Sequence, residues 1–386
     1  MSLLQVYHFH NGQQGGVWSV ISNLLRYNQH PLIQNHVIFC IEHRAKRNVK
    51  LPAVTGASSV QFFYYSANWN FYYTCKKMAS LLPDQKAVVV AHDWPELGMM
   101  SNLGLQNPVV QWLHGDYSYY YTLAVKHQHA INRFVTVSAK IAENLCSLLP
   151  HRKAHIQYLR FPVPAVQPAT IQGTLHNIIF IGRLSTDKGY PLLPQIDSLL
   201  ASKSIFLQWH IVGEKPQDTA MLPWADETRV TYYGAIGNQQ LLDILPNMHL
   251  FILPSLAEGM PVTLAESMKA GLIPLVNNLG GGIAELIIPE QTGFLIEHNS
   301  IEQYATAIRR IITGEVNAAH ISQQAMALAN QLFDAAINTQ LAESVLQAAA
   351  TDSLHKMPEK VYGSRLDKKW MPNFFTAMLR KFSKNG

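Results

Sequence analysis

Short, continuous apolar runs alternate with longer amphipathic stretches along the first half of the chain. Apolar residues at successive positions indicate strands that are buried on both faces of a sheet. Amphipathic helices are predicted between the runs, at Gly16–Tyr27 and, after Ser138 as N-cap, at Ala139–Leu149. The predicted strands are Leu3–Tyr7, His36–Ile41, Ala87–Ala91, Pro108–Leu113 and Arg133–Val137. This order predicts a parallel sheet with helices on its faces.

The alternation stops at a proline-rich segment and then starts again. Pro162, Pro164 and Pro168 fall within seven residues and favour an extended linker. The strands predicted after it are His176–Ile181, Phe206–Val212, Val230–Tyr233, Leu250–Leu253 and Ile273–Val276. We therefore expect an α/β protein with two doubly wound, Rossmann-like domains, residues 1–165 and 166–348, that face a cleft.

The end of the chain differs in character from both predicted domains. Phe333–Ala349 is rich in Ala and Leu and is predicted to be helical, whereas residues 349–386 are basic and aromatic. Large apolar residues of this tail recur three to four positions apart, with Lys and Arg between them. The residues concerned are Lys356, Lys360, Arg365, Lys368, Lys369, Trp370, Met371, Phe374, Phe375, Met378, Leu379, Arg380, Lys381, Phe382 and Lys384. Either the C-terminal helices pack back on the first domain or the tail contacts a membrane surface.

Composition narrows the class of protein. The chain has 386 residues, of which 48% are hydrophobic and only 14% are charged, so it can bury large cores and is not a disordered chain. The net charge of +5 permits an anionic partner without naming one. Cys40, Cys75 and Cys146 lack metal-ligand spacing and are expected to be buried thiols in a reducing compartment.

The N-terminus shows no basic region or cleavage site, and no apolar run is long enough to span a bilayer. We therefore expect no signal peptide, and a cytoplasmic protein or one peripheral on the inner face of the membrane.

Two cations follow the strand predicted at His176–Ile181. Arg183 and Lys188 lie five residues apart, so both can reach one phosphate group, Arg as a planar fork and Lys as a point charge. Two solvated surface cations would have the same spacing. The pair alone therefore indicates an anion site without proving one.

Two glutamates flank the start of the helix predicted near Val262. Glu258 lies in the loop before the helix and Glu266 about one turn inside it, so both can face a ligand at the helix N-terminus. Carboxylates accept hydrogen bonds from sugar and ribose hydroxyls. Ordinary helix capping would also place acids here.

Glycines close several other predicted strands. Gly213 and Gly234 each end a strand, where the missing side chain lets a flat base approach the backbone. Three glycines in 277–285 precede a helix and suit a phosphate. The 11–17 segment, which includes Gly16, does not match the dinucleotide fingerprint.

The first domain offers residues for a second ligand. His92 and Asp93 follow one strand, where they either bind a ligand or cap the following turn, and His114 follows another. Asp116 and Tyr117 lie in a tyrosine-rich loop that can stack on a sugar or pack into the core.

These elements, in this order, resemble the retaining glycosyltransferases of family four, which have the GT-B fold. The resemblance spans roughly residues 3–348 and is densest in 176–296, through Gly182-Arg183-Leu184 with Lys188-Gly189, Glu258 with Glu266, and the Gly280–Gly282 turn. The first half matches more loosely, through Gly15-Gly16-Val17 and His114.

The resemblance implies a role for each matching position. Arg183 and Lys188 would hold the donor diphosphate, Glu266 the ribose hydroxyls and Glu258 the transferred sugar. Backbone near the sugar and phosphate would come from Gly259, Met260, Pro261 and Val262, with Gly16 closing over the diphosphate from the first domain. His114 would lie near the sugar and acceptor. Such enzymes retain the anomeric configuration and need neither cofactor nor metal, which agrees with the absence of an Asp-x-Asp signature.

We therefore expect transfer of a sugar from a nucleotide-diphosphate donor, UDP before GDP, to a hydroxyl of a glycan or glycolipid in cell-surface polysaccharide or lipopolysaccharide synthesis. The partners expected are the nucleotide sugar and the acceptor, without nucleic acid. The alternatives are a non-catalytic nucleotide-sugar or glycan-binding subunit and a sugar-nucleotide epimerase of the same fold.

Overall fold

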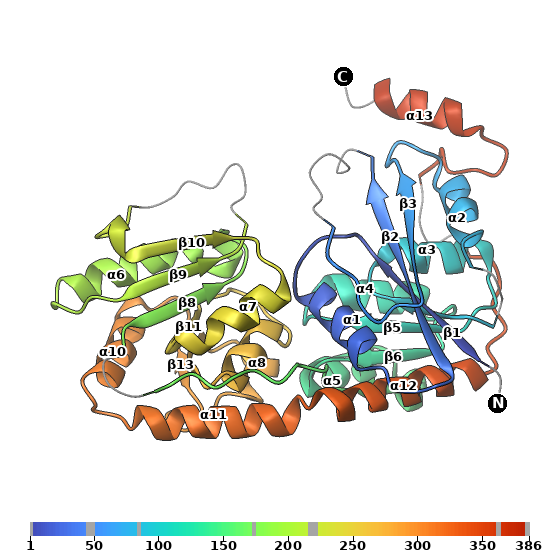
Figure 1. Ribbon diagram of the computed structural model, residues 1–386. Coiled ribbons are helices and arrows are strands. Elements are labelled where there is room, and N and C mark those ends of the chain that lie inside the picture. The colour runs from blue at the N-terminus through green and yellow to red at the C-terminus, as the bar shows by residue number, and fades with distance from the viewer. Residues whose placement is uncertain are drawn as a thin grey trace. The chain divides into compact units, whose positions relative to one another are not determined.

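A computed structural model describes residues 3–43, 51–82, 86–171, 175–214, 223–359 and 364–382. The chain divides into two compact units (Figure 1). Unit 1 contains Met1–Val137, Ile141–Phe161 and Ala336–Gly386, and unit 2 contains Ser138–Lys140 and Pro162–Ala335. The C-terminal residues thus belong to the same unit as the N-terminus, as expected for C-terminal helices that return to the first domain. Lys360 and Lys384 of the predicted basic tail lie outside the described residues.

Unit 1 is built on a seven-stranded parallel sheet in the order β3-β2-β1-β4-β5-β6-β7. Its strands are β1 (Leu4–His10), β2 (Ile33–Glu42), β3 (Ser59–Tyr65), β4 (Val88–Ala91), β5 (Val109–Leu113), β6 (Arg133–Thr136) and β7 (Ile156–Tyr158). Its helices are α1 (Gly16–Tyr27), α2 (Phe71–Ala79), α3 (Trp94–Leu103), α4 (Ser118–His127), α5 (Ala139–Leu148), most of α12 (Ala335–Thr351) and α13 (Asn373–Phe382). Every residue of β4 and β5 is buried, which explains their unbroken apolar sequence.

Unit 2 repeats the arrangement with six parallel strands in the order β10-β9-β8-β11-β12-β13. Its strands are β8 (Asn177–Ile181), β9 (Gln208–Val212), β10 (Val230–Gly234), β11 (Leu250–Leu253), β12 (Ile273–Asn277) and β13 (Phe294–Ile296). Its helices are α6 (Leu193–Ala201), α7 (Asn238–Ile244), α8 (Val262–Lys269), α9 (Gly281–Ala284), α10 (Ile301–Ile312) and α11 (Ala318–Leu332). A buried ion pair joins Arg229 to Asp197, which also accepts from Trp209 Nε1 at 2.8 Å.

The strand order identifies one special point in each sheet. In unit 1 the chain winds from β1 toward β3 on one side and from β4 toward β7 on the other, so the direction reverses between β1 and β4. In unit 2 the reversal lies between β8 and β11. Doubly wound sheets bind ligands at the carboxyl ends of the strands beside such a point.

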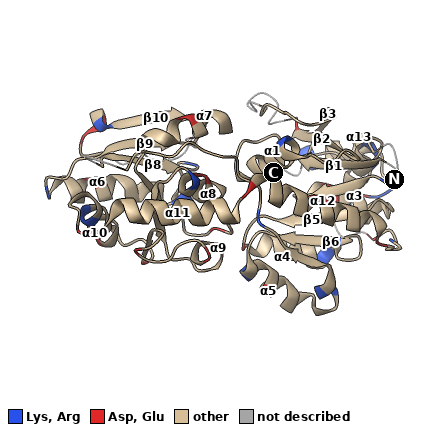
Figure 2. Cartoon of the chain, turned by 60° about the horizontal axis from the view of Figure 1, so that its bottom comes forward, with Lys and Arg blue, Asp and Glu red and all other residues tan. Residues whose placement is uncertain are grey.

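The structure confirms every predicted strand to within a few residues at each end and adds three. The sequence analysis missed β3, β7 and β13. β7 and β13 have three residues each, too short for a periodicity, and the exposed positions of β3 interrupt its apolar run. Tyr64 and Tyr65 lie on β3. Charged residues are sparse over both units (Figure 2).

Candidate active site

The charged residues predicted in the loops of unit 2 follow β8 and β11, beside the reversal point of the sheet. Lys188 follows β8 and Glu258 follows β11, and Lys188 Nζ donates to Glu258 Oε1 at 2.7 Å. The two side chains are 19% and 11% exposed, so this ion pair is largely withdrawn from water. The neighbouring backbones also touch, since a Cβ on Gly189 would lie 2.0 Å from the Pro254 carbonyl oxygen. The ion pair is therefore held by two loops in direct contact.

Arg183 has a different carboxylate partner. Its guanidinium donates to Asp187 Oδ2 at 2.9 Å, and both side chains are more than half exposed. An exposed pair of this kind contributes little to stability, so the guanidinium can turn to a stronger anion at low cost. The sequence analysis placed Arg183 and Lys188 on one phosphate. In the structure each cation is paired with its own carboxylate, and the shared anion remains a prediction.

The loop after β11 leads directly into α8 through Gly259 and Met260. Pro261 is the N-cap of the helix and Val262 its first residue, and no side chain caps the first turn. A helix N-terminus without a side-chain cap leaves backbone N–H groups that attract an anion. The approach of α9 depends on glycine, because a Cβ on Gly282 would lie 2.2 Å from the Gly259 carbonyl oxygen. The glycine turn predicted after β12 thus supports the loop that carries Glu258.

Glu266 lies one turn inside α8, as predicted, and is fully buried. Burial raises the pKa of its carboxyl group to about 7, partly opposed by a 2.6 Å hydrogen bond from Asn238 Nδ2. The sequence analysis missed Asn238, the first residue of α7. Its only sequence signal is a glycine–asparagine pair shortly after a strand, which also marks ordinary turns.

The two strand-end glycines differ from each other. A Cβ on Gly213 would lie 1.8 Å from the Gly182 carbonyl oxygen, so the absent side chain makes room for protein backbone. Gly234 has open space around its Cα and a left-handed φ of +67°. Room for a flat base was the reason assigned to both. For Gly213 that space is already filled by the chain itself.

In unit 1 the carboxyl ends of β1, β4 and β5 bring three histidines into a chain. His8 Nδ1 lies 3.4 Å from His92 Nε2, and His92 Nδ1 lies 2.8 Å from His114 Nε2. His8 Nε2 lies 3.2 Å from Asn35 Oδ1 on β2. This histidine chain (His8, His92 and His114) lies at the reversal point of the first sheet. Gly16, predicted on the same side, is the first residue of α1.

Burial keeps the histidine chain neutral. Desolvation lowers the pKa of His114 to about 3 and that of His8 to about 4, and lowers the pKa of His92 well below its usual value. A neutral imidazole carries one N–H. Because Asn35 Oδ1 accepts from His8 Nε2, each ring along the chain donates from Nε2 and accepts at Nδ1. The last ring, His114, therefore presents Nδ1 as a hydrogen-bond acceptor.

Asp93 caps a helix. It is the N-cap of α3 and completes a capping box with Glu96, whose carboxylate accepts from the backbone N–H of His92 and of Asp93 at 2.7 Å each. The Tyr119 hydroxyl also donates to Asp93. The structure thus shows the capping alternative of the sequence analysis. A ligand contact of His92 or Asp93 remains a prediction.

The tyrosine-rich loop is ordered by its own contacts. Asp116 accepts from the Tyr121 hydroxyl and, at 3.2 Å, from Asn144 Nδ2. The Tyr117 ring covers Gly115, where a Cβ would lie 2.2 Å from a ring carbon. These contacts hold the loop beside His114 without assigning a ligand to it.

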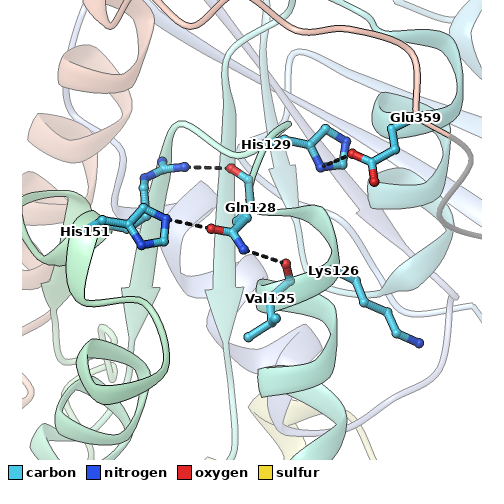
Figure 3. A pocket seen from close by; sticks show the side chains of 7 residues that line it. Val125, Lys126, Gln128, His129, His151 and Glu359 are labelled. Carbon is cyan, nitrogen blue, oxygen red and sulfur yellow. Dashed lines mark hydrogen bonds and ion pairs between the residues drawn. The ribbon is translucent and has the colours of Figure 1, made fainter.

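A hollow of about 430 Å³ on unit 1 contains none of the predicted site residues (Figure 3). Its lining side chains bind one another: His151 Nε2 lies 2.8 Å from Gln128 Oε1, and His129 Nδ1 lies 3.1 Å from Glu359. Within the described ranges no cluster of His, Cys, Asp and Glu is arranged to hold a metal ion. No helix in the same ranges is long and apolar enough to cross a bilayer.

Comparison with known proteins identifies the domain family of unit 2 and the fold. Residues 166–327 match the family model for glycosyl transferases group 1. A UDP-Gal:alpha-D-GlcNAc-diphosphoundecaprenol alpha-1,3-galactosyltransferase of Escherichia coli is 39% identical over 74 residues, 19% of each chain. The amylovoran biosynthesis glycosyltransferase AmsK of Erwinia amylovora is 26% identical over 183 residues, 45% of each chain. The crystal structure of Anabaena HepE with UDP and glucose superposes with a TM-score of 0.70 at 16% identity, covering 89% of this chain and 100% of that chain.

The chain spans about half the length of the first curated relatives it matches. The similarity in sequence is concentrated in unit 2, and the structural similarity extends over most of both units. The chain therefore carries a glycosyl transferases group 1 domain at residues 166–327 and has the GT-B fold.

Proposed function

We propose that this protein transfers a sugar, with retention of configuration, from a nucleotide-diphosphate donor to a hydroxyl of a glycan or lipid-linked glycan in polysaccharide or lipopolysaccharide synthesis. The observation that carries the proposal is the withdrawn Lys188–Glu258 ion pair at the reversal point of unit 2. It combines a cation suited to phosphate with a carboxylate suited to sugar hydroxyls. The group 1 domain and the relatives' names support the same class of reaction.

The leaving diphosphate defines the first requirement of this chemistry. When the bond between the sugar C1 and the phosphate oxygen breaks, the electron pair remains on the diphosphate. Lys188, Arg183 and the uncapped start of α8 would stabilise that charge. Their combined positive charge would serve in place of a bound metal ion. Lys188 would exchange its bond to Glu258 for the phosphate, which frees the carboxylate for the sugar.

The two glutamates would then divide the donor between them. Glu258 would accept hydrogen bonds from the transferred sugar, and Glu266 from the ribose. Glu266 is fully buried with a pKa of about 7, so it can bind a ribose hydroxyl as acceptor or as donor near neutral pH. Asn238 orients it through the 2.6 Å hydrogen bond. Gly213 and Gly234 would border the base, with only Gly234 leaving open space beside its Cα.

The acceptor defines the second requirement. As the acceptor oxygen bonds to C1, its proton would move to the departing phosphate oxygen, so the reaction needs no protein base. His114 would accept a hydrogen bond at Nδ1 and position a hydroxyl of the sugar or acceptor. The donating pattern along the histidine chain supports that role. Asp116 and Tyr117 lie in the adjoining loop and would contact the acceptor with His92 and Asp93.

A uridine donor is favoured over a guanosine donor. The Escherichia coli relative is named for UDP-Gal, and HepE was solved with UDP and glucose. The same relative's diphosphoundecaprenol substrate favours a lipid-linked acceptor and a reaction at the inner face of a membrane.

A thermal-shift screen tests the donor assignment. UDP, GDP and their common sugars would be added to the full chain and to the Lys188→Ala variant, with exposed Lys203→Ala as matched control. Ligand at a hundred times its dissociation constant should stabilise the folded state by about 2.7 kcal/mol. We expect the shift with UDP compounds in the wild type and in Lys203→Ala, and its loss in Lys188→Ala.

Absence of a shift with every nucleotide would refute the donor site. Binding that is followed neither by sugar transfer to added acceptors nor by donor hydrolysis would favour a non-catalytic subunit. Recovery of an epimerised nucleotide sugar would favour an epimerase.

A further inference from the structure

Helix α13 turns its apolar side chains to solvent. Trp370, just before the helix, is 74% exposed, Phe374 is 73% exposed and Phe382 is 72% exposed. Phe375, Met378 and Leu379 are exposed as well. Large apolar side chains gathered on one short element are unusual on a soluble surface, where such residues are normally scattered. Figure 1 shows α13 at the margin of unit 1, beside α2.

The opposite side of α13 is polar and holds the helix to unit 1. Asn373 Oδ1 accepts from the backbone N–H of Asn70 at 2.7 Å. Thr376 is fully buried and donates to the Leu366 carbonyl oxygen at 3.2 Å. Arg380 donates to Asp367 Oδ2 at 2.7 Å and also to the Trp69 carbonyl oxygen.

The anchor extends into the turn before the helix. Asn70 Nδ2 donates to the carbonyl oxygens of Lys368 and Met371 at 2.9 and 2.8 Å, and Asp367 Oδ1 accepts from the Phe71 N–H at 2.6 Å. Asn70 is fully buried. These bonds fix the orientation of α13 on unit 1.

The helix is therefore amphipathic in the reverse sense of a surface helix in a globular protein. At about 100° per residue, Phe374, Phe375, Met378, Leu379 and Phe382 fall within an arc of about 140°. The anchoring residues Asn373, Thr376 and Arg380 lie on the other side of the helix. A helix that only completed a core would turn its apolar face inward. Here the polar face of α13 packs on unit 1 and the apolar face is exposed to solvent.

Exposed cations precede α13 in the chain and lie in its last turn. The exposed cations are Arg365, Lys368, Lys369 and Lys381. Among the described tail residues 364–382 the one acidic residue is Asp367, and it forms an ion pair with Arg380. Lys368 and Lys369 also line a hollow of about 150 Å³ with Tyr72, Asn102 and Asp367. Exposed Lys76 and Lys77 close the last turn of α2, to which this segment is anchored.

We propose that the exposed face of α13 docks unit 1 onto an anionic lipid bilayer, with the apolar residues entering the headgroup region and the lysines meeting lipid phosphates. An aromatic and aliphatic face flanked by Lys and Arg is what an interfacial helix requires. A second copy of the chain fits less well, because pairing two α13 faces would bring like charges together. This surface contains none of the proposed donor residues, so the inference does not depend on the proposed function.

Docking would have a consequence for a lipid-linked acceptor. A surface-bound enzyme meets such an acceptor at the concentration in the membrane, whereas a soluble acceptor gains nothing from docking. The helix is fixed on unit 1 by direct bonds, so docking would also orient unit 1 relative to the bilayer.

Vesicle co-sedimentation of the full chain tests the proposal. The probes are vesicles of phosphatidylcholine alone and vesicles with a quarter of phosphatidylglycerol. We expect wild-type protein to sediment with the anionic vesicles and much less with the neutral ones. The double variant Phe375→Asp/Leu379→Asp should weaken binding at least about tenfold. The variant Lys368→Glu/Lys369→Glu should weaken binding to anionic vesicles only, and high salt should have the same effect.

Met357→Ser is the matched control, because Met357 is an equally exposed apolar residue of unit 1 outside α13. It should leave vesicle binding unchanged. Circular dichroism and melting temperature show whether each variant is folded, and both substituted lysines are exposed, so the charge variant does not threaten the fold. Equal vesicle binding by the wild type, Phe375→Asp/Leu379→Asp and Lys368→Glu/Lys369→Glu would overturn the proposal. So would a change from dimer to monomer in Phe375→Asp/Leu379→Asp without a change in vesicle binding.

Discussion

The two units share one topology and differ in the chemistry at its reversal point. In unit 2 the ends of β8 and β11 carry the Lys188–Glu258 ion pair, which is largely withdrawn from water but keeps some exposed surface. In unit 1 the ends of β1, β4 and β5 carry neutral histidines that are buried and joined ring to ring. A doubly wound sheet thus determines where side chains converge. The loops that follow the strands determine whether the site suits an anion or a neutral hydroxyl.

Burial explains the difference in charge. A buried imidazole loses the solvation that its charged form needs, so the histidine chain stays neutral. Each neutral ring donates one hydrogen bond and accepts another, so the direction of donation is the same along the chain. The Lys188–Glu258 pair places two opposite charges against each other and remains partly exposed. The donor diphosphate would meet the charged site, and an acceptor or sugar hydroxyl the neutral one.

Acid should separate the two units most strongly. The unfolded chain protonates its histidines near pH 6.5. In the folded protein the pKa is about 4 for His8 and for His10, the buried last residue of β1, and about 3 for His114. The unfolded state therefore binds more protons in this window, and unit 1 loses about 1.4 kcal/mol per pH unit for each net proton as the pH falls. Buried Glu96, with a pKa of about 8, has the opposite effect. Between pH 4.5 and pH 8 its carboxyl group holds one more proton in the folded state than in the unfolded state, so it adds stability as the pH falls.

Thermal unfolding at pH 6.5 and pH 4.5 measures the effect. We expect the transition of unit 1 to move down in acid by more than that of unit 2. His92→Gln should reduce the pH dependence. An unchanged pH dependence in that variant would contradict a neutral, buried histidine chain.

Loss of the charged site should cost most of the activity. Lys188→Met removes the cation proposed for the diphosphate and should lower kcat about 100-fold to 1,000-fold. The double variant Lys188→Met/Glu258→Leu removes both ions, so it should be more stable than Lys188→Met and equally inactive. Steady-state transfer assays and thermal melts measure the two effects. Normal turnover of Lys188→Met would contradict the assignment of the charged site in unit 2 to the donor diphosphate.

The glycines of unit 2 test how tightly its site is built. Gly213→Ala would push a methyl group into the Gly182 carbonyl oxygen and should destabilise unit 2 by about 3 kcal/mol. Gly234→Ala meets open space and only the strain of its left-handed φ, a cost of about 1 kcal/mol. Urea denaturation of both variants measures the difference. Equal losses would show that backbone contact at Gly213 is not the constraint.

Glu266 should give the smallest effect. Its folded pKa of about 7 lies above the usual 4.5, so its contribution to stability decreases as the pH rises from 4.5 through 7. Glu266→Gln should flatten that pH dependence and weaken nucleotide binding about tenfold, the loss of one hydrogen bond to a charged group. Thermal melts at pH 6 and pH 8 measure the first effect, and calorimetric titration with UDP measures the second. Undiminished affinity would place the ribose elsewhere.

Much of the fold was predictable because buried parallel strands have continuous apolar sequences. The runs at β4, β5, β8 and β11 are of this kind, and Glu266 fell one turn inside its helix as predicted. The partners of the site residues were not predictable. Asn238 and Asn35 are ordinary polar residues in sequence, and they acquire a role only where strand order places them beside Glu266 and His8.

The sequence by itself determined the two-sheet architecture, the resemblance to glycosyltransferases that is densest in residues 176–296, and the positions of the charged and glycine-bearing loops. These follow from local periodicity and from residue types at strand ends. Only the tertiary structure decided which charges pair, that three histidines separated by more than a hundred residues form one chain, and that α13 turns its polar face inward. Such contacts depend on strand order and burial, which bring together residues that no local pattern connects.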